Sequence, residues 1–173
     1  MTTPRRCVRS AKPSPPTTSA ANRRSYGITA STLAEHHLES GRYTAAAQQA
    51  ADAITIWREL EGADPYLGVD AHKNLGLARA ALGRPADAVE PLHTALRIAD
   101  DTGYTPGRRP LLAALARAHR DAGEPILSIG YFEEALATAE DPREPPTDAT
   151  VQRTLQRELD AVLEQVTASP TRH

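Results

Sequence analysis

Histidines and acidic residues are the side chains of this sequence whose types could support catalysis or metal binding. The segment EHHLE, residues 35–39, comes closest to a metal cluster. Adjacent residues on a helix point about 100° apart, so His36 and His37 cannot both reach one ion from a single helix. We therefore interpret this segment as a solvated helix face, with His37 turned into a contact between helices. No metal site is expected there.

Paired acidic residues do not predict an acid–base site either. Glu133 with Glu134 and Asp100 with Asp101 fall on a helix surface and at a helix end. The sequence contains no His-Glu-x-x-His segment, no paired cysteines, no glycine-rich phosphate loop and no Gly-x-Ser-x-Gly. We expect a non-catalytic chain that needs no cofactor and no metal.

Composition narrows the class of fold. The chain of 173 residues is only 4% aromatic, and its β-branched residues never form a strand-like run, so we expect an all-α protein with one core. The single cysteine, Cys7, excludes an internal disulfide and favours a cytoplasmic location. No apolar run is long enough to span a membrane.

Charge is distributed unevenly along the chain. Six of the 20 basic residues lie before residue 35, where there is no acidic residue. Because residues 1–26 are rich in proline, serine and arginine and poor in large apolar side chains, we expect a disordered tail. Clustered arginines attract phosphates, so a nucleic-acid-associated regulator that uses this tail is the alternative function. A solubilising leader and an over-extended gene start are the other interpretations.

Three glycines that follow helical stretches mark an internal repeat: Gly41, Gly83 and Gly123. A leucine stands eight residues before each glycine, and small residues stand seven before, five after and twelve after. In order, these columns are Leu33, Leu75 and Leu115; Ala34, Gly76 and Ala116; Ala46, Ala88 and Ser128; Ala53, Ala95 and Ala135. Small side chains let two helix backbones approach closely, and the glycine forms the left-handed turn between them. We therefore expect three helical hairpins stacked into a short solenoid.

Prolines occupy two kinds of position in this repeat. Pro85 and Pro125 open the second helix of a hairpin, in the first turn, where a missing N–H costs nothing. Pro91 instead falls near the second turn, where it removes the helical hydrogen bond to the carbonyl of Asp87. We expect a bend there and not a break.

The segment NLGLARAALGRPADAVEPLHTALRI, residues 74–98, resembles the tetratricopeptide repeat, and especially its long-period form, which occurs in kinesin light chains and bacterial signalling regulators. The resemblance covers about residues 27–140. It implies a right-handed α-solenoid over residues 27–145, with repeats at about 27–62, 64–103 and 105–141. The sequence departs from the family where large aromatics are usual, at Ala30, His72 and Leu112, and where tyrosine is usual, at His37, Arg79 and His119. We therefore expect thin packing between the units and modest stability.

After a proline-rich linker, the pattern of residues 146–167 predicts one more helix. We expect residues 168–173 to form a disordered end. Thr147 or Asp148 is expected to cap the start of this helix. Its apolar face consists of Val151, Leu155, Leu159, Val162, Leu163 and Val166, and its polar face includes Arg153, Arg157, Glu158 and Glu164. We expect this helix to cover the open end of the solenoid, with a partner-binding helix as the alternative.

The resemblance also implies a function. In the family the first helix of each unit lines a concave groove that binds a peptide or a segment of a partner protein. The candidate groove residues are Lys73, Asn74, Leu77, Arg117, Arg120 and Glu35. The resemblance implies that Asn74 bonds the backbone of an extended peptide, and an amide suits that task because it offers donor and acceptor together.

The basic groove residues predict a ligand with acidic groups near the second and third units. The expected function is therefore a non-catalytic protein–protein interaction module, or the repeat portion of a bacterial regulator. A solvated groove without a dedicated ligand is the alternative.

Overall fold

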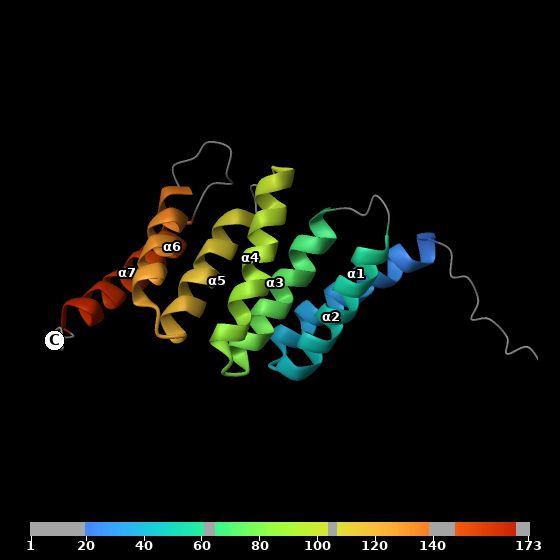
Figure 1. Cartoon of the computed structure of the whole chain (residues 1–173), viewed down its shortest axis with the longest axis horizontal. Helices are drawn as coiled ribbons and strands as arrows, with labels where there is room; N and C mark the ends of the chain where they lie inside the picture. The colour runs from blue at the N-terminus through green and yellow to red at the C-terminus, as the bar shows by residue number, and fades with distance from the viewer. Residues whose placement is uncertain (1–19, 61–64, 104–106, 139–147, 169–173) are drawn as a thin grey trace, which may run out of the picture.

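The computed structural model describes residues 20–60, 65–103, 107–138 and 148–168. Within these ranges the chain forms seven α-helices and no strand: α1 (Ala20–Glu39), α2 (Tyr43–Glu59), α3 (Pro65–Ala81), α4 (Pro85–Thr102), α5 (Arg108–Asp121), α6 (Pro125–Ala137) and α7 (Ala149–Ala168). Helices that follow one another in the chain pack side by side along the long axis of the molecule (Figure 1). The predicted right-handed α-solenoid of three hairpins and a final helix is confirmed.

The turns inside the hairpins form where the repeated glycines predict them. Gly41, Gly83 and Gly123 have φ angles of +70°, +74° and +83°, a region that glycine enters without a Cβ clash. The N–H of the residue after each glycine bonds back into the preceding helix, as Arg84 does to the carbonyl of Arg79 at 3.0 Å. These bonds satisfy carbonyls that the helix end would otherwise leave unpaired.

Small residues bring α3 and α4 into close contact. A Cβ atom on Gly76 would lie 2.5 Å from Cγ of Leu92 and 3.2 Å from the carbonyl oxygen of Ala88. Ala88 and Ala95 are both completely buried, as their columns in the repeat predict. The two helices therefore meet at a distance that only these small side chains permit.

The buried apolar side chains form two separate clusters of unequal quality. The larger cluster joins the second and third hairpins to α7 and contains large side chains such as Leu92, Leu115 and Phe132. The smaller one joins the first hairpin to α3, and most of its members are alanines, with Ile54 and Leu75 as its large residues. Because burial energy grows with apolar area, the first hairpin contributes less to the stability of the fold.

The N-terminal boundary differs from the prediction. Residues 20–26, which the sequence assigns to a disordered tail, form the first turns of α1. An ion pair between Nη1 of Arg23 and Oε2 of Glu59, 3.1 Å long, joins these turns to the end of α2. Polar composition suggested a tail here, but alanine and arginine also favour a helix. The rest of the predicted tail, residues 1–19, lies outside the described residues, as do the linker at 139–147 and residues 169–173.

The last helix begins with the predicted cap, because Oδ1 of Asp148 accepts a hydrogen bond from the N–H of Thr150 at 2.8 Å. Leu155, Leu159 and Val162 are buried in the larger core cluster, so α7 covers the third hairpin. Two further residues of the predicted apolar face, Val151 and Leu163, remain exposed.

Candidate partner-binding face

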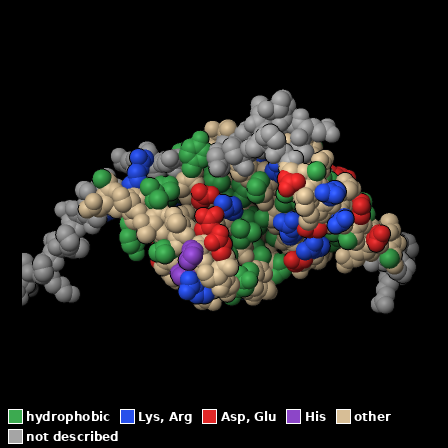
Figure 2. Space-filling view, turned by 180° about the vertical axis from the view of Figure 1, so that it is seen from behind, with side chains coloured by type: hydrophobic (Ala, Val, Ile, Leu, Met, Phe, Trp, Pro, Cys, Tyr) green, Lys and Arg blue, Asp and Glu red, His purple; other side chains and the backbone are tan. Residues whose placement is uncertain are grey.

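The first helices of the three hairpins, α1, α3 and α5, present equivalent positions to solvent. Six residues before each turn glycine stand Glu35, Leu77 and Arg117, so this position is acidic in α1, apolar in α3 and basic in α5. We call the surface formed by these three residues and by their neighbours on the same side of the three helices the first-helix face. Figure 2 shows a surface with the same order of properties, with hydrophobic side chains between an acidic group and a mixed group of basic and acidic side chains.

Asn74 is not part of this exposed face. Its side chain is buried, with the residue 2% exposed, and its Nδ2 donates a hydrogen bond to the carbonyl oxygen of Ser31 in α1 at 3.3 Å. The small residues of α1 bring its backbone close to α3, so the amide that was predicted to hold a bound peptide holds the neighbouring helix instead. This bond fixes the position of the first hairpin on the second.

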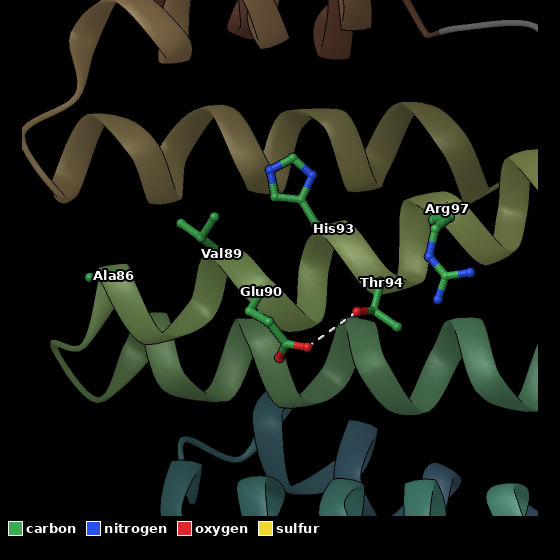
Figure 3. Close-up of a pocket in the computed structure, with 6 residues that line it drawn as sticks. All are labelled: Ala86, Val89, Glu90, His93, Thr94 and Arg97. Atoms are coloured by element: carbon green, nitrogen blue, oxygen red, sulfur yellow. Dashed lines mark hydrogen bonds between the residues drawn. The ribbon is translucent and has the colours of Figure 1, made fainter.

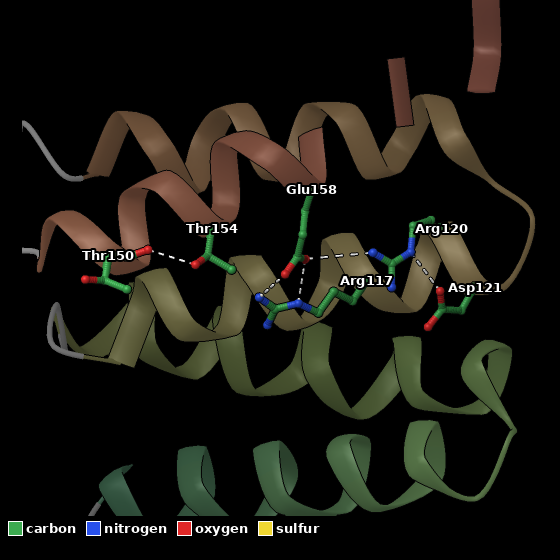
Figure 4. Close-up of polar contacts among 6 residues, drawn as sticks. All are labelled: Arg117, Arg120, Asp121, Thr150, Thr154 and Glu158. Atoms are coloured by element: carbon green, nitrogen blue, oxygen red, sulfur yellow. Dashed lines mark hydrogen bonds and ion pairs between the residues drawn. The ribbon is translucent and has the colours of Figure 1, made fainter. Parts of the chain in front are cut away.

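The two predicted groove arginines are brought together, but with an acidic partner from the chain itself. Arg117 donates two hydrogen bonds to Glu158 of α7, from Nε to Oε2 at 2.7 Å and from Nη2 to Oε1 at 2.9 Å (Figure 4). Nη1 of Arg120 lies 3.8 Å from the same carboxylate, and its Nε donates to Asp121 at 2.8 Å. The planar fork of arginine suits this two-point contact with a carboxylate.

Sequence reasoning placed Glu158 on the outer polar face of α7, and that placement is wrong. Its side chain is only 23% exposed and lies against α5. Helical periodicity places Glu158 next to the buried positions Leu155 and Leu159, which is the one signal that could have indicated an inward orientation.

The remaining predicted residues differ in their surroundings. Nζ of Lys73 lies 2.8 Å from Oδ1 of Asp70, one turn earlier on α3. Leu77 is exposed at 36% between the charged positions of α1 and α5. Glu35 is exposed and forms no ion pair within the described parts of the chain. The face therefore offers one apolar side chain at its centre and a carboxylate at its α1 end.

A cluster of rings that the sequence did not predict lies where the second hairpin meets the third. The rings of His119 and Tyr131 are stacked at 5.2 Å, and His93 meets both edge-on at 5.9 and 5.6 Å. Tyr131 Oη lies 3.2 Å from Nε2 of His93, and Nδ1 of His119 lies 2.6 Å from a carboxylate oxygen of Glu124. These residues come from α4, α5, α6 and the turn before α6, so no local spacing in the sequence predicts their contact.

Partial burial, with the nearby charge of His119, lowers the pKa of His93 below its ordinary value. His93 also borders a shallow depression on α4, together with Ala86, Val89, Glu90, Thr94 and Arg97. Figure 3 shows these side chains spread along one side of α4, where Thr94 donates to Glu90 at 3.4 Å. They do not converge on a common point, so the depression has no arrangement for holding a small ligand.

Among the described residues, no three histidine, cysteine, aspartate or glutamate side chains are grouped so that they could hold a metal ion. No helix in the same part of the chain combines the length and the apolar character that a membrane span requires.

Comparison with known families agrees with the hairpin architecture. Two models described as tetratricopeptide repeat match residues 25–101 and 111–146. The chain contains tetratricopeptide repeats. The first match spans the first two hairpins and the second covers most of the third, so the models and the helices divide the chain in the same way. No curated protein sequence matches the chain.

Solved structures with tetratricopeptide-like repeats share this fold at low sequence identity. A TPR-like protein from Chlorobium tepidum is 16% identical with a TM-score of 0.71, and the match covers 86% of this chain and 99% of that one. The TPR domain of Arabidopsis FLU is 17% identical with a TM-score of 0.64, over 68% and 98% of the two chains. A kinesin light chain-like protein of Podospora anserina with nearly identical TPR-like repeats is 20% identical with a TM-score of 0.69, over 83% and 68%. At these identities the likeness concerns the fold alone.

Proposed function

We propose that this chain is a non-catalytic protein-interaction module, that its first-helix face is the concave side of the repeat solenoid, and that a segment of a partner protein binds along this face. The observation that carries the proposal is the exposure of Leu77 in the middle of this face, between the equivalent positions Glu35 and Arg117. An apolar side chain held on a rigid helix, with charged side chains on either side, can anchor a partner and orient it.

The contacts of Asn74 and Arg117 change how such a partner would bind. With the Asn74 amide bonded to Ser31, the side chain that could have held a peptide backbone is occupied. With Arg117 bonded to Glu158, the α5 end of the face is joined to α7. The proposed contact surface is therefore centred on α1 and α3, with Leu77 as its apolar anchor.

Affinity capture from the native host tests this proposal with a matched pair of leucine substitutions. Leu77→Ser removes the proposed anchor, whereas Leu127→Ser changes a more exposed leucine on α6, the second helix of the third hairpin. We expect proteins captured by the wild type and by Leu127→Ser to be absent from the Leu77→Ser sample, while circular dichroism shows that both variants fold. Identical sets of captured proteins for the two variants would refute binding at this face.

The proposal extends to a regulatory setting, in which the chain supplies the partner-binding part of a bacterial signalling or transcriptional regulator. The resemblance to long-period repeats of such regulators supports it. The genomic neighbourhood tests it, because an adjacent reading frame for a DNA-binding or nucleotide-binding domain is expected. The alternative of a nucleic-acid-associated regulator depends on the arginines of residues 1–26, most of which lie outside the described part of the chain.

A further inference from the structure

The basic side chains of the first-helix face are already paired with acidic groups of the same chain. The pairs are Lys73 with Asp70 at 2.8 Å, Arg117 with Glu158 at 2.7 Å and Arg120 with Asp121 at 2.8 Å. Each pair brings together one positive and one negative charge. The three cations that first suggested an acidic ligand are therefore each offset by a carboxylate of the same chain.

Carboxylates without a strong ion pair lie on α1. Glu35 has no ion-pair partner among the described residues, and Glu39 has only Nδ1 of His36 at 3.8 Å, with the Glu39 side chain 71% exposed. Residues four apart lie on the same side of a helix, about 6 Å apart along its axis, so the two carboxylates point to the same region of solvent. Figure 2 shows a group of acidic side chains beside the hydrophobic part of this surface.

Apolar side chains continue the same surface. Ile28 lies two turns before Glu35 on the same side of α1 and is 47% exposed. Leu77 occupies in α3 the position that Glu35 occupies in α1, and it is 36% exposed. A segment that crosses from α1 to α3 would therefore meet carboxylates and apolar side chains together.

We infer that the partner segment is cationic, with a lysine or arginine next to an apolar side chain that packs on Leu77. This inference rests on the proposed function and reverses the acidic ligand expected from the sequence. An acidic segment would have to displace Glu158 from its two-point contact with Arg117, whereas a cationic one finds Glu35 without a partner. Exposed ion pairs are individually weak, so the apolar contact supplies most of the affinity and the carboxylates supply the choice of charge.

Two fluorescein-labelled octapeptides test the choice of charge. Both have the same leucines and alanines, and one carries two lysines where the other carries two glutamates, two positions apart. Fluorescence anisotropy with the full chain should show about tenfold tighter binding of the lysine peptide at low ionic strength, and a smaller preference as salt screens the charges.

Charge reversal provides the control. The double variant Glu35→Lys, Glu39→Lys should lose the preference for the lysine peptide and bind the glutamate peptide better. The double variant Glu133→Lys, Glu164→Lys changes the net charge equally at two exposed positions on α6 and α7, and it should keep the wild-type preference.

The outcomes separate this inference from the proposed function. Equal binding of both peptides, weakened by Leu77→Ser, would overturn the inference about charge and leave binding at this face intact. Tighter binding of the glutamate peptide to the wild type would overturn the inference as well. Failure of both peptides to bind would overturn the inference and count against the first-helix face as a binding surface.

Discussion

The guanidinium of Arg79 in α3 donates a hydrogen bond to the backbone carbonyl oxygen of Asp87 in α4, from Nη1 at 2.9 Å. Asp87 lies four residues before Pro91, which lacks the N–H that would bond this carbonyl inside a regular helix. Arg79 supplies the missing donor from the neighbouring helix. Helix α4 accordingly continues through Pro91 to Thr102 without a break.

Exchanging Arg79 for methionine tests this relationship, because methionine keeps the apolar stem and removes the donor. In the wild type we expect Arg79→Met to lower the free energy of unfolding by about 1 kcal/mol, which is the net contribution of one hydrogen bond to stability. In a Pro91→Ala background the alanine N–H bonds the carbonyl of Asp87, so the same change should cost less than half as much. Urea unfolding of the four proteins gives the coupling directly, and equal costs in both backgrounds would contradict the assigned role.

Arg79 also shows what the sequence could predict and what it could not. The bond lost at Pro91 follows from the chemistry of proline and was predicted together with the tolerance of α4 for it. The replacement donor comes from another helix, at a position where Arg79 was noted only as a departure from the usual tyrosine. Local spacing does not determine which side chain reaches across a contact between two helices.

For the fold and the candidate face as well, local features could be predicted from the sequence and contacts between helices could not. The repeated glycines and small residues predicted the hairpins, because turns and close helix contacts depend on few atoms. The contacts of Asn74 with Ser31 and of Arg117 with Glu158 join residues about 40 positions apart. They depend on how far one helix is displaced against the next, which the repeat pattern leaves open.

Gly76 offers a test of the close contact between α3 and α4. Gly76→Ala should destabilise the protein by about 1–3 kcal/mol, because the new Cβ would collide with Leu92 and approach the backbone at Ala88. Gly130→Ala in α6 is the matched control, since nothing lies within 4 Å of a Cβ there and alanine favours a helix. It should raise stability by about 0.5–1 kcal/mol. Thermal midpoints that shift in the same direction for both variants would disagree with the described packing.

Covering of the third hairpin by α7 can be tested with two leucines of that helix. Leu159 is 6% exposed and belongs to the larger core cluster, whereas Leu163 is 40% exposed. Leu159→Ala should lower the unfolding free energy by about 2–5 kcal/mol, as other buried leucines do, and Leu163→Ala should have a much smaller effect. Comparable effects in chemical denaturation would mean that α7 is not docked on the third hairpin as described.

Acid should weaken the fold through two histidines whose pKa values are lowered. Burial lowers the pKa of His72, opposed by Glu90 and assisted by Arg58 and Arg97, and burial beside His119 lowers the pKa of His93. The unfolded chain then binds more protons than the folded one as the pH falls below about 6.5, so stability decreases in that range. The urea midpoint should therefore fall between pH 7.5 and pH 5.

Substitution separates this effect from general acid sensitivity. His93→Phe keeps a ring against Tyr131 and removes the titrating group, so the decrease of the urea midpoint with acid should be smaller than in the wild type. His36→Gln, which alters a histidine whose side chain is 68% exposed, is the matched control. The assignment would be wrong if the profile of His93→Phe coincided with that of the wild type.

The unequal core clusters predict that the first hairpin opens before the rest of the protein. Its cluster consists mainly of alanines, and four buried polar atoms of α1, α2 and α3, on Ser31, His37, Trp57 and His72, have no hydrogen-bond partner among the described residues. Such groups cost free energy when buried, and small side chains offset little of it.

Backbone amides in the middle of α2 should therefore exchange with deuterium at a lower opening free energy than those in the middle of α5, where Leu111, Leu112 and Leu115 are completely buried. Mass spectrometry of peptides from α2 and α5 after timed exchange measures the difference. Equal protection of the two helices would show that the whole solenoid opens as one unit.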